Sequence, residues 1–142
     1  MGLRKTNVII KEYQLDIGIV QVFDNYMVSI FEEGVTLTLE RAYQIIGISE
    51  IHFREKKFGY ISLRKNSYAI DPVIYTYLRG LDNLNAFAIV SKKEIDMHNY
   101  NIEKMFYKKN MKFFIEYENA IEWVKKRLSK KAKRKKNTWI VT

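Results

Sequence analysis

Cysteine is absent from this chain of 142 residues, and proline occurs once, at position 72. The lack of cysteine excludes disulfides, a thiolate nucleophile and a zinc site built on cysteine. Because nothing points to an oxidising compartment, we expect a cytoplasmic protein. Residues 1–10 contain only three consecutive apolar residues, too few for a signal-peptide core or a membrane span.

Chemical motifs are also scarce. The sequence contains no glycine-rich phosphate loop and no nucleophile elbow, and its two histidines, His52 and His98, lack a metal-ligand spacing. Nothing in the sequence places Ser67, His98 and Asp71 together as a catalytic triad. We therefore expect no enzyme activity, no cofactor and no bound metal.

The net charge of +9 is concentrated at one end of the chain. Residues 125–136 hold nine of the 25 basic residues and no acidic residue, which leaves 16 basic and 16 acidic residues in positions 1–124. Any affinity for nucleic acid or an anionic membrane is therefore expected to belong to the tail. The tail residues expected to bind polyanions are Lys130, Lys131, Lys133, Arg134, Lys135 and Lys136.

Three interpretations of this basic tail stay open from the sequence. A continued last helix would expose a basic stripe to solvent, whereas a disordered arm would bind nucleic acid. Near an anionic membrane each Lys or Arg adds about 1 kcal/mol, so four or five of them support only weak association. The tail is thus expected to assist an association rather than to define one.

Length and composition favour a single packed domain. A chain of 142 residues with 47% hydrophobic residues is large enough for one core and too short for two domains of ordinary size. We assign this domain to residues 1–128 and treat residues 129–142 as the basic C-terminal tail. The sequence shows no internal repeat, and low complexity is confined to the tail.

The first part of the domain predicts a hairpin and a helix. Apolar residues recur at every second position along the stretch from Tyr13 to Phe31, as in a β-strand. A turn at Asp24-Asn25 divides this stretch into two strands. Thr38 then supplies an N-cap for a helix. The inward side of that helix is expected to carry Ala42, Ile45, Ile46 and Ser49.

The central unit is a strand of residues 58–63, a polar loop and a helix that opens at Asp71-Pro72. Asp is a favoured N-cap, and Pro is a favoured first helical residue because it has no N–H to leave unpaired. The inward side of this helix is expected to carry Ile74, Tyr77 and Leu78. Tyr75 is expected to face away from that side.

The second half continues the alternation of strands and helices. Residues 85–90 are nearly all apolar, as in a strand covered on both faces, and residues 91–94 match a capping box. The apolar residues on the inward side of the helix that follows are Ile95, Ile102, Met105 and Phe106. A last strand and helix are expected at residues 112–116 and 118–128.

The predicted order is therefore ββαβαβαβα. Strands that alternate with helices imply an α/β fold with right-handed parallel crossovers, in which only the N-terminal hairpin is antiparallel. The chain resembles the SpoIIAA-like fold in this order and in four stretches, DNYMVSIFEEGVTLT, FGYISLRKNSYAIDP, FAIVSKKE and AIEWV. That fold includes the STAS domains and the small stand-alone bacterial proteins labelled STAS/SEC14-like.

The resemblance covers roughly residues 13–128. It implies a mixed sheet with helices wound against it, and a module that binds a protein or a ligand. Most small members of this kind have no defined activity, so the resemblance implies a regulatory or binding role without catalysis.

STAS anti-sigma-factor antagonists carry a phosphorylatable serine in an Asp-Ser-Ser-Gly run before the second helix. The equivalent place here is residues 65–71, where Ser67 is the candidate for phosphorylation and an ordinary turn residue is its alternative role. This sequence departs from the run, because it has no second serine and no glycine there. The helix N-terminus and Arg64 would favour a phosphate on Ser67, whereas Asp71 would oppose it.

The first functional hypothesis is a non-catalytic, STAS-like regulatory module that binds an unknown protein partner through residues 64–71 and the following helix. The candidate contact residues are Arg64, Ser67, Tyr68, Asp71 and Tyr75. The alternative is SEC14-like binding of a lipid or other apolar small molecule, aided at membranes by the tail, and it requires a sizeable apolar cavity. An exposed strand edge or sheet face would also allow a homodimer.

Overall fold

The computed structural model describes the backbone of residues 8–141 and the side chains of residues 8–129. Six strands form a mixed sheet in the order β1-β2-β3-β5-β7-β8. The antiparallel strands are β1 (Lys11–Leu15), β2 (Gly18–Val22) and β3 (Tyr26–Phe31). The strands added in parallel are β5 (Phe58–Leu63), β7 (Leu84–Val90) and β8 (Met111–Phe114). The expected α/β class with a mixed sheet is confirmed.

The N-terminal part contains three strands where the sequence predicted two. A tight turn at Asp16-Ile17 separates β1 from β2, and Gly18 follows it with a φ of +146°. A Cβ atom at Gly18 would lie 2.2 Å from the carbonyl oxygen of Ile30, so only glycine fits this close approach. The two-strand prediction is wrong because the apolar alternation continues through the turn.

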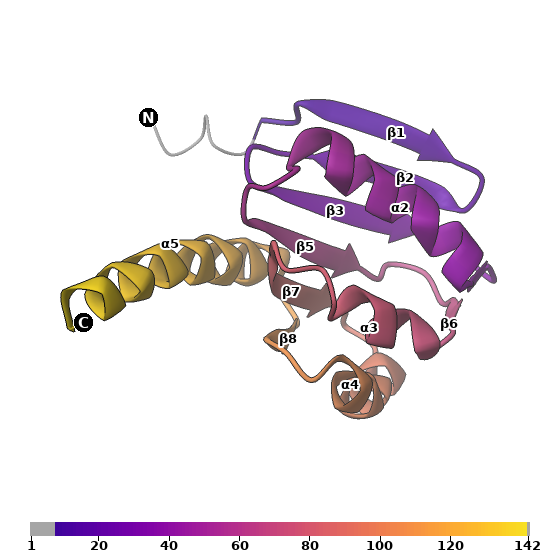
Figure 1. The fold of residues 1–142 in the computed structure, drawn as a ribbon. Coiled ribbons are helices and arrows are strands. Elements are labelled where there is room, and N and C mark those ends of the chain that lie inside the picture. The colour runs from indigo at the N-terminus through magenta and orange to yellow at the C-terminus, as the bar shows by residue number, and fades with distance from the viewer. Residues whose placement is uncertain (1–7, 142) are drawn as a thin grey trace.

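Helices cover the sheet on both faces (Figure 1). The helices α2 (Leu39–His52), α3 (Val73–Leu78) and α4 (Glu94–Tyr107) lie on one face, and α5 (Tyr117–Val141) lies on the other. A short parallel ladder of β4 (Thr36–Leu37) and β6 (Ala69–Ile70) joins the segments that lead into α2 and α3. The core accordingly has two parts, one on each side of the sheet.

The start and the inward side of α2 are confirmed. The hydroxyl oxygen of Thr38 accepts a hydrogen bond from the backbone N–H of Arg41 at 3.2 Å. The residues of α2 that were predicted to face inward are all buried: Ala42, Ile45, Ile46 and Ser49. The strand β5 has its predicted bounds, and β7 is internal and buried from Ala86 to Val90.

The helix α4 lies where the sequence predicted it, but its start differs. The helix begins at Glu94, after Lys93 in the cap position, and no side chain caps it. The hydroxyl of Ser91 instead accepts a hydrogen bond from the N–H of Lys93 at 3.0 Å and donates one to Asp96 at 2.6 Å. Ser91 therefore lies two residues before the cap position, and only Glu94 of the four capping-box residues belongs to the helix.

The inward side of α4 also differs from the prediction. The residues predicted to face inward are exposed by 57%, 46%, 68% and 41%, in the order Ile95, Ile102, Met105 and Phe106. Glu103 and Tyr107 are the buried residues of this helix. The prediction is wrong because it assigned the apolar side to the sheet, whereas a charge partner within the core determines which side faces inward.

Helix α5 packs closely on the sheet at Gly59. A Cβ atom there would lie 2.3 Å from Cγ1 of Val124, so the missing side chain lets α5 approach β5. The predicted inward residues Ala120, Val124 and Leu128 are buried, and Ile121 is half-buried. The face of the sheet under α5 is therefore covered as the sequence predicted.

Helix α5 continues to Val141, past the domain boundary expected at residue 128. The side chains of the tail candidates lie outside the described residues; these candidates are Lys130, Lys131, Lys133, Arg134, Lys135 and Lys136. Among the helices of the described segment, none combines the length and the apolar character needed to cross a membrane.

Candidate functional site

The loop of residues 64–71 leaves the carboxyl end of β5 and leads into α3. At its start, the N–H of Arg64 donates a hydrogen bond to the carbonyl oxygen of Val90 at the end of β7, at 2.8 Å. Near its end, the N–H of Ala69 donates to the carbonyl oxygen of Val35 at 3.0 Å. Open α/β sheets bind ligands at the carboxyl ends of their strands, so this loop marks the candidate site.

The side chain of Arg64 turns inward and meets Glu103 of α4. Its two terminal nitrogens donate to the two carboxylate oxygens of Glu103 at 2.8 and 3.1 Å, which is a bidentate ion pair. Its Nε donates to the hydroxyl oxygen of Ser62 at 3.1 Å. Arg64 is 6% exposed and Glu103 is 9% exposed, so separating them would leave a buried charge unpaired. The pair thus fastens α4 to the end of β5.

Two tyrosines extend this buried network. The hydroxyl of Tyr75 accepts a hydrogen bond from Arg64 at 3.2 Å and donates one to Glu103 at 2.5 Å. The hydroxyl of Tyr68 lies 2.9 Å from the hydroxyl of Ser62. Burial raises the pKa of both tyrosines, although Arg64 acts in the opposite direction. Both phenols are therefore neutral near pH 7 and serve as hydrogen-bonding groups.

The position of Tyr75 corrects the prediction that it faces outward. Tyr75 is 2% exposed and lies between Phe87 of β7 and Tyr107 of α4, whereas Tyr77 is 44% exposed. The predicted assignment of these two tyrosines is therefore reversed. The cause is that α3 contacts both the sheet and α4, so its buried side is shifted toward Tyr75 and away from Tyr77.

Arg64 and Tyr68 also lie inward rather than on a contact surface. The half-buried ring of Tyr68 packs edge-on against Phe31, with ring centroids 5.1 Å apart, and the Arg64 guanidinium lies 5.7 Å from the centroid of the Tyr68 ring. These two residues anchor the loop from beneath. A partner that approaches the loop would meet its other side chains first.

The exposed side of the loop carries Lys65, Ser67 and Asp71. The backbone N–H of Ser67 donates to the carboxylate of Glu33 at 2.9 Å, and its hydroxyl oxygen accepts from Nζ of Lys93 at 3.1 Å. Neighbouring segments therefore hold Ser67 from both sides. The loop thus presents Ser67 to solvent with its backbone N–H and its hydroxyl both hydrogen-bonded.

Asp71 acts on the start of α3, as the sequence predicted. Its Oδ1 accepts a hydrogen bond from the backbone N–H of Val73 at 3.1 Å. The helix itself begins at Val73, one residue later than predicted. Since a capping role accounts for Asp71, its exposure alone does not make it a ligand group.

A surface groove of about 600 Å³ runs beside the loop, at the carboxyl ends of β5 and β7 and the start of α5. Lys65 and Lys93 line it together with Ile115 and Glu118. The groove thus combines positive, negative and apolar groups. This mixture suits a protein segment better than a ligand of one charge.

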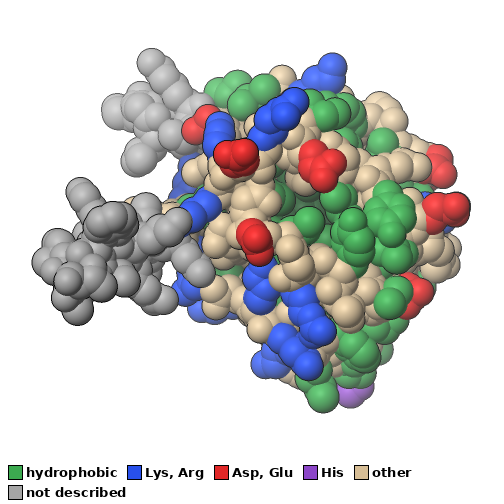
Figure 2. All heavy atoms as spheres, in the orientation of Figure 1, with side chains coloured by type: hydrophobic (Ala, Val, Ile, Leu, Met, Phe, Trp, Pro, Cys, Tyr) green, Lys and Arg blue, Asp and Glu red, His purple; other side chains and the backbone are tan. Residues whose placement is uncertain are grey.

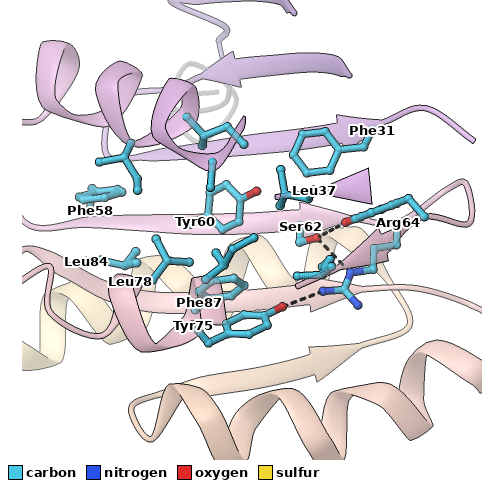
Figure 3. Close-up of a pocket in the computed structure, with 16 residues that line it drawn as sticks. Phe31, Leu37, Phe58, Tyr60, Ser62, Arg64, Tyr75, Leu78, Leu84 and Phe87 are labelled. Carbon is cyan, nitrogen blue, oxygen red and sulfur yellow. Dashed lines mark hydrogen bonds between the residues drawn. The ribbon is translucent and has the colours of Figure 1, made fainter. Parts of the chain in front are cut away.

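A second hollow lies inside the protein, between the sheet and the helices α2 and α3. Figure 3 shows its apolar end at Phe58, Leu78 and Leu84, and its polar end where Arg64 reaches toward Ser62 and Tyr75. Its volume is about 40 Å³, which is room for only a few water molecules. Sites for small organic ligands usually measure about 300 to 1,000 Å³. This space is part of a packed core.

The structure does not bring Ser67, His98 and Asp71 together as a triad. Ser67 is held by Lys93 and Glu33, Asp71 caps α3, and His98 lies on the exposed side of α4. Within the described residues, no cluster of three or more potential metal-binding side chains occurs.

Sequence reasoning missed three residues of the site: Glu33, Lys93 and Glu103. Nothing in the sequence marks Glu33 or Lys93 as a site residue, because each is distant from Ser67 along the chain and contacts it only in the folded protein. Glu103 carries no clear signal either, because it lies three residues before Phe106 and so flanks the apolar stripe of α4. Recognising it required the position of Arg64, 39 residues earlier in the chain.

No protein-family model, curated protein or solved structure matches this chain.

Proposed function

We propose that this chain is a non-catalytic, STAS-like regulatory module of the cytoplasm, which binds a protein partner at the outer side of residues 64–71. The observation that carries the proposal is the set of hydrogen bonds that holds this loop on the protein. Arg64 and Tyr68 anchor it from beneath, and Glu33 and Lys93 hold Ser67 from the sides. A loop that is already ordered loses little conformational entropy when a partner binds, which favours affinity.

The contact surface we propose differs from the one expected from sequence. Lys65, Ser67 and the adjoining groove replace Arg64 and Tyr75, because the latter two are buried. The groove supplies charges of both signs beside an apolar residue, as protein-binding surfaces do. The basic tail is proposed to strengthen an association with an anionic partner rather than to select one.

Phosphorylation of Ser67 would act directly on this surface. A phosphate adds a charge of about −1.5 to −2. Lys93 already lies at 3.1 Å from the serine oxygen and would pair with it, whereas Glu33 at the backbone N–H would repel it. We propose that phosphorylation would draw Lys93 in and loosen the contact to Glu33, which would change the shape of the loop.

The lipid-binding alternative has less support. It requires an apolar cavity of several hundred Å³, and the internal space between the sheet and α2 and α3 measures about 40 Å³. A lipid chain would enter only after the packed core had opened. We therefore place the protein-binding module first.

The test compares Lys65→Glu with a matched control. Lys65 and Lys56 are both exposed, but Lys56 precedes β5 at the opposite end of the strand. The full chain and each variant would be used to capture proteins from the native cell lysate, and the affinity of a captured partner would then be measured. Lys65→Glu is expected to weaken binding roughly tenfold, or by about 1.4 kcal/mol. Lys56→Glu is expected to leave binding unchanged.

Equal affinity for the two variants would contradict the proposed surface. Capture of an apolar small molecule in place of a protein, detected by native mass spectrometry of the full chain, would favour the lipid-binding alternative.

A further inference from the structure

The charges of the folded domain are divided unequally between the two ends of the strands β3, β5, β7 and β8. The segments that lead into these strands hold six basic and three acidic residues, and they are residues 23–25, 53–57, 79–83 and 108–110. The segments that follow the same strands hold four basic and four acidic residues, and they are residues 32–38, 64–72, 91–93 and 115–116. The amino ends of the strands therefore carry a net positive charge, although residues 1–124 are neutral as a whole.

Basic side chains from α3 and α4 lie together at these amino ends. Arg79 and Lys108 line one hollow, where the two helices end. The Nζ atom of Lys109 donates a hydrogen bond to the carbonyl oxygen of Arg79 at 3.2 Å, so the turn before β8 belongs to the same surface. Basic side chains gather in the region of β8 and this turn, in the lower left part of the molecule in Figure 2.

The strand β8 and the helix α5 continue this surface. Lys112 of β8 lines a second hollow together with Lys125 and Lys126 of α5, and Glu122 is the acidic side chain that lines it. The basic surface formed in this way, here called the basic end, consists of Arg79, Lys108, Lys109, Lys112, Lys125 and Lys126.

Local structure accounts for only part of these charges. Lys109 donates to carbonyl oxygens at the end of α3, and Arg79 donates to the carbonyl oxygen of Phe106 at the end of α4. Such contacts stabilise helix C-termini. Lys108 and Lys112 are exposed, and within the described residues neither is paired with a carboxylate. Positive charges gathered without counter-ions attract an anionic partner.

Helix α5 carries the basic tail away from the same end of the domain. The helix packs on the sheet as far as Leu128 and then extends past the amino ends of the strands (Figure 1). Its residues 129–141 add about 20 Å of helix. The domain and the extended part of α5 therefore form two sides of a corner, and the basic end lies where the two sides meet.

We infer that the chain binds double-stranded nucleic acid through its phosphates, at the basic end and along the extended part of α5. A duplex carries one negative charge per about 1.7 Å of its axis, so it supplies phosphates along both sides of the corner. Contacts to phosphates carry no sequence information, and we expect binding without sequence preference. The inference adds the folded domain to the tail, to which the sequence assigned any such affinity. Because the basic end lies opposite the loop of residues 64–71, the inference does not rest on the proposed function.

A duplex fits this corner better than an anionic membrane does. A membrane laid flat against the basic end would have α5 pointing into it, and basic residues are costly in the hydrocarbon layer. A membrane laid along α5 would require an apolar stripe on that helix. Residues 125–136 have no such stripe, because the residues among them that are not basic are Leu128, Ser129 and Ala132. A rod-shaped duplex can contact the helix and the domain together.

The test measures the affinity of the full chain for a short fluorescent DNA duplex by anisotropy, at several salt concentrations. Lys108→Glu and Lys112→Glu are each expected to weaken binding about three- to tenfold. Each is also expected to reduce the slope of log affinity against log salt by about 1, because one phosphate contact is lost.

Lys92→Glu is the matched control. It makes the same change in net charge at an exposed lysine that follows β7, at the opposite end of the sheet. Because that distance exceeds the Debye length of about 10 Å in 0.1 M salt, the control is expected to keep the salt slope and to change affinity less than about twofold. Circular dichroism would verify that all three variants are folded.

Three results would overturn the inference: a full chain that does not bind the duplex, equal losses of affinity in Lys92→Glu and in the two variants of the basic end, or tighter binding of a single strand than of the duplex. Tighter binding to vesicles of anionic phospholipid than to the duplex, lost in Lys112→Glu, would assign the basic end to a membrane instead.

Discussion

Replacing Glu103 with alanine is expected to lower the free energy of unfolding by about 3–5 kcal/mol, because Arg64 would stay buried without its counter-ion. Both side chains are shielded from water, with 5% and 11% of their surface exposed, so solvent screening offsets little of this loss. Urea denaturation followed by circular dichroism would measure it as a lower transition midpoint at an unchanged slope. A loss below about 1 kcal/mol would contradict the buried pair.

The matched control removes both charges together. In the double variant Arg64→Met with Glu103→Leu, no charge is left unpaired in the core. This variant is expected to be less destabilised than Glu103→Ala alone, because apolar groups of similar size often replace a buried ion pair at little loss of stability. If the double variant were the less stable of the two, the loss would come from packing rather than from an unpaired charge.

The second large effect is expected for Tyr75→Ala, which should destabilise the protein by about 3–5 kcal/mol. Tyr75 is fully buried, contacts Phe87 and Tyr107, and hydrogen-bonds with Arg64 and Glu103. Its removal leaves a large cavity and takes away a hydrogen bond from both charges. The measurement is again the free energy of unfolding in urea.

Tyr77→Ala provides the control, two residues along the same helix. Tyr77 is 44% exposed and packs edge-on against Tyr43, with ring centroids 5.4 Å apart. Its replacement is expected to cost about 1 kcal/mol or less, because mainly this aromatic contact is lost. If Tyr77→Ala were the more damaging change, the orientation of α3 described above would be wrong.

Those parts of the fold that depend on local chemistry were predictable from the sequence. Thr38 begins α2 because its side chain accepts a backbone N–H, which needs no distant partner. The strands β5 and β7 follow from apolar composition, since both are covered on both faces. In the same way, Asp71 is recognisable as a cap before Pro72.

The turn between β1 and β2 was not predictable from alternation alone. The period of two that marks a strand continues through Asp16-Ile17 into β2, so one long strand and two short ones look alike. Gly18 is the only sign of the turn. Glycine is required at position 18 because a Cβ atom there would collide with the backbone of Ile30 on β3. That close approach exists only in the folded sheet, so the sequence does not reveal it.

The orientation of α4 shows a second limit of sequence patterns. An apolar stripe identifies one side of a helix but does not say what covers it. In this protein the side of α4 that carries Glu103 faces the core, because Glu103 is the buried counter-ion of Arg64 at the end of β5. The apolar stripe is then left exposed to solvent. The same limit applies to Tyr75 and Tyr77, whose burial depends on where α4 lies.

The loop of the candidate site lies where the sequence placed it, but two of the five candidate contact side chains are buried. Residues 64–71 do lie at the carboxyl end of β5, as the βα pattern predicted. Of the five candidate side chains, Ser67 and Asp71 are exposed, Tyr68 is half-buried, and Arg64 and Tyr75 are in the core. Polar residues in a loop can anchor it as readily as they can bind a partner, and only the folded contacts distinguish these roles.

The central claim is that α4 presents its apolar side to solvent, and thiol labelling tests it most directly because the chain has no cysteine of its own. Met105→Cys would be labelled in the full chain at a concentration that keeps it monomeric, with Ser91→Cys as the buried reference. The account predicts that the thiol at position 105 reacts nearly as fast as in urea, while the thiol at position 91 reacts only on unfolding. Protection of position 105 in the native monomer would contradict it.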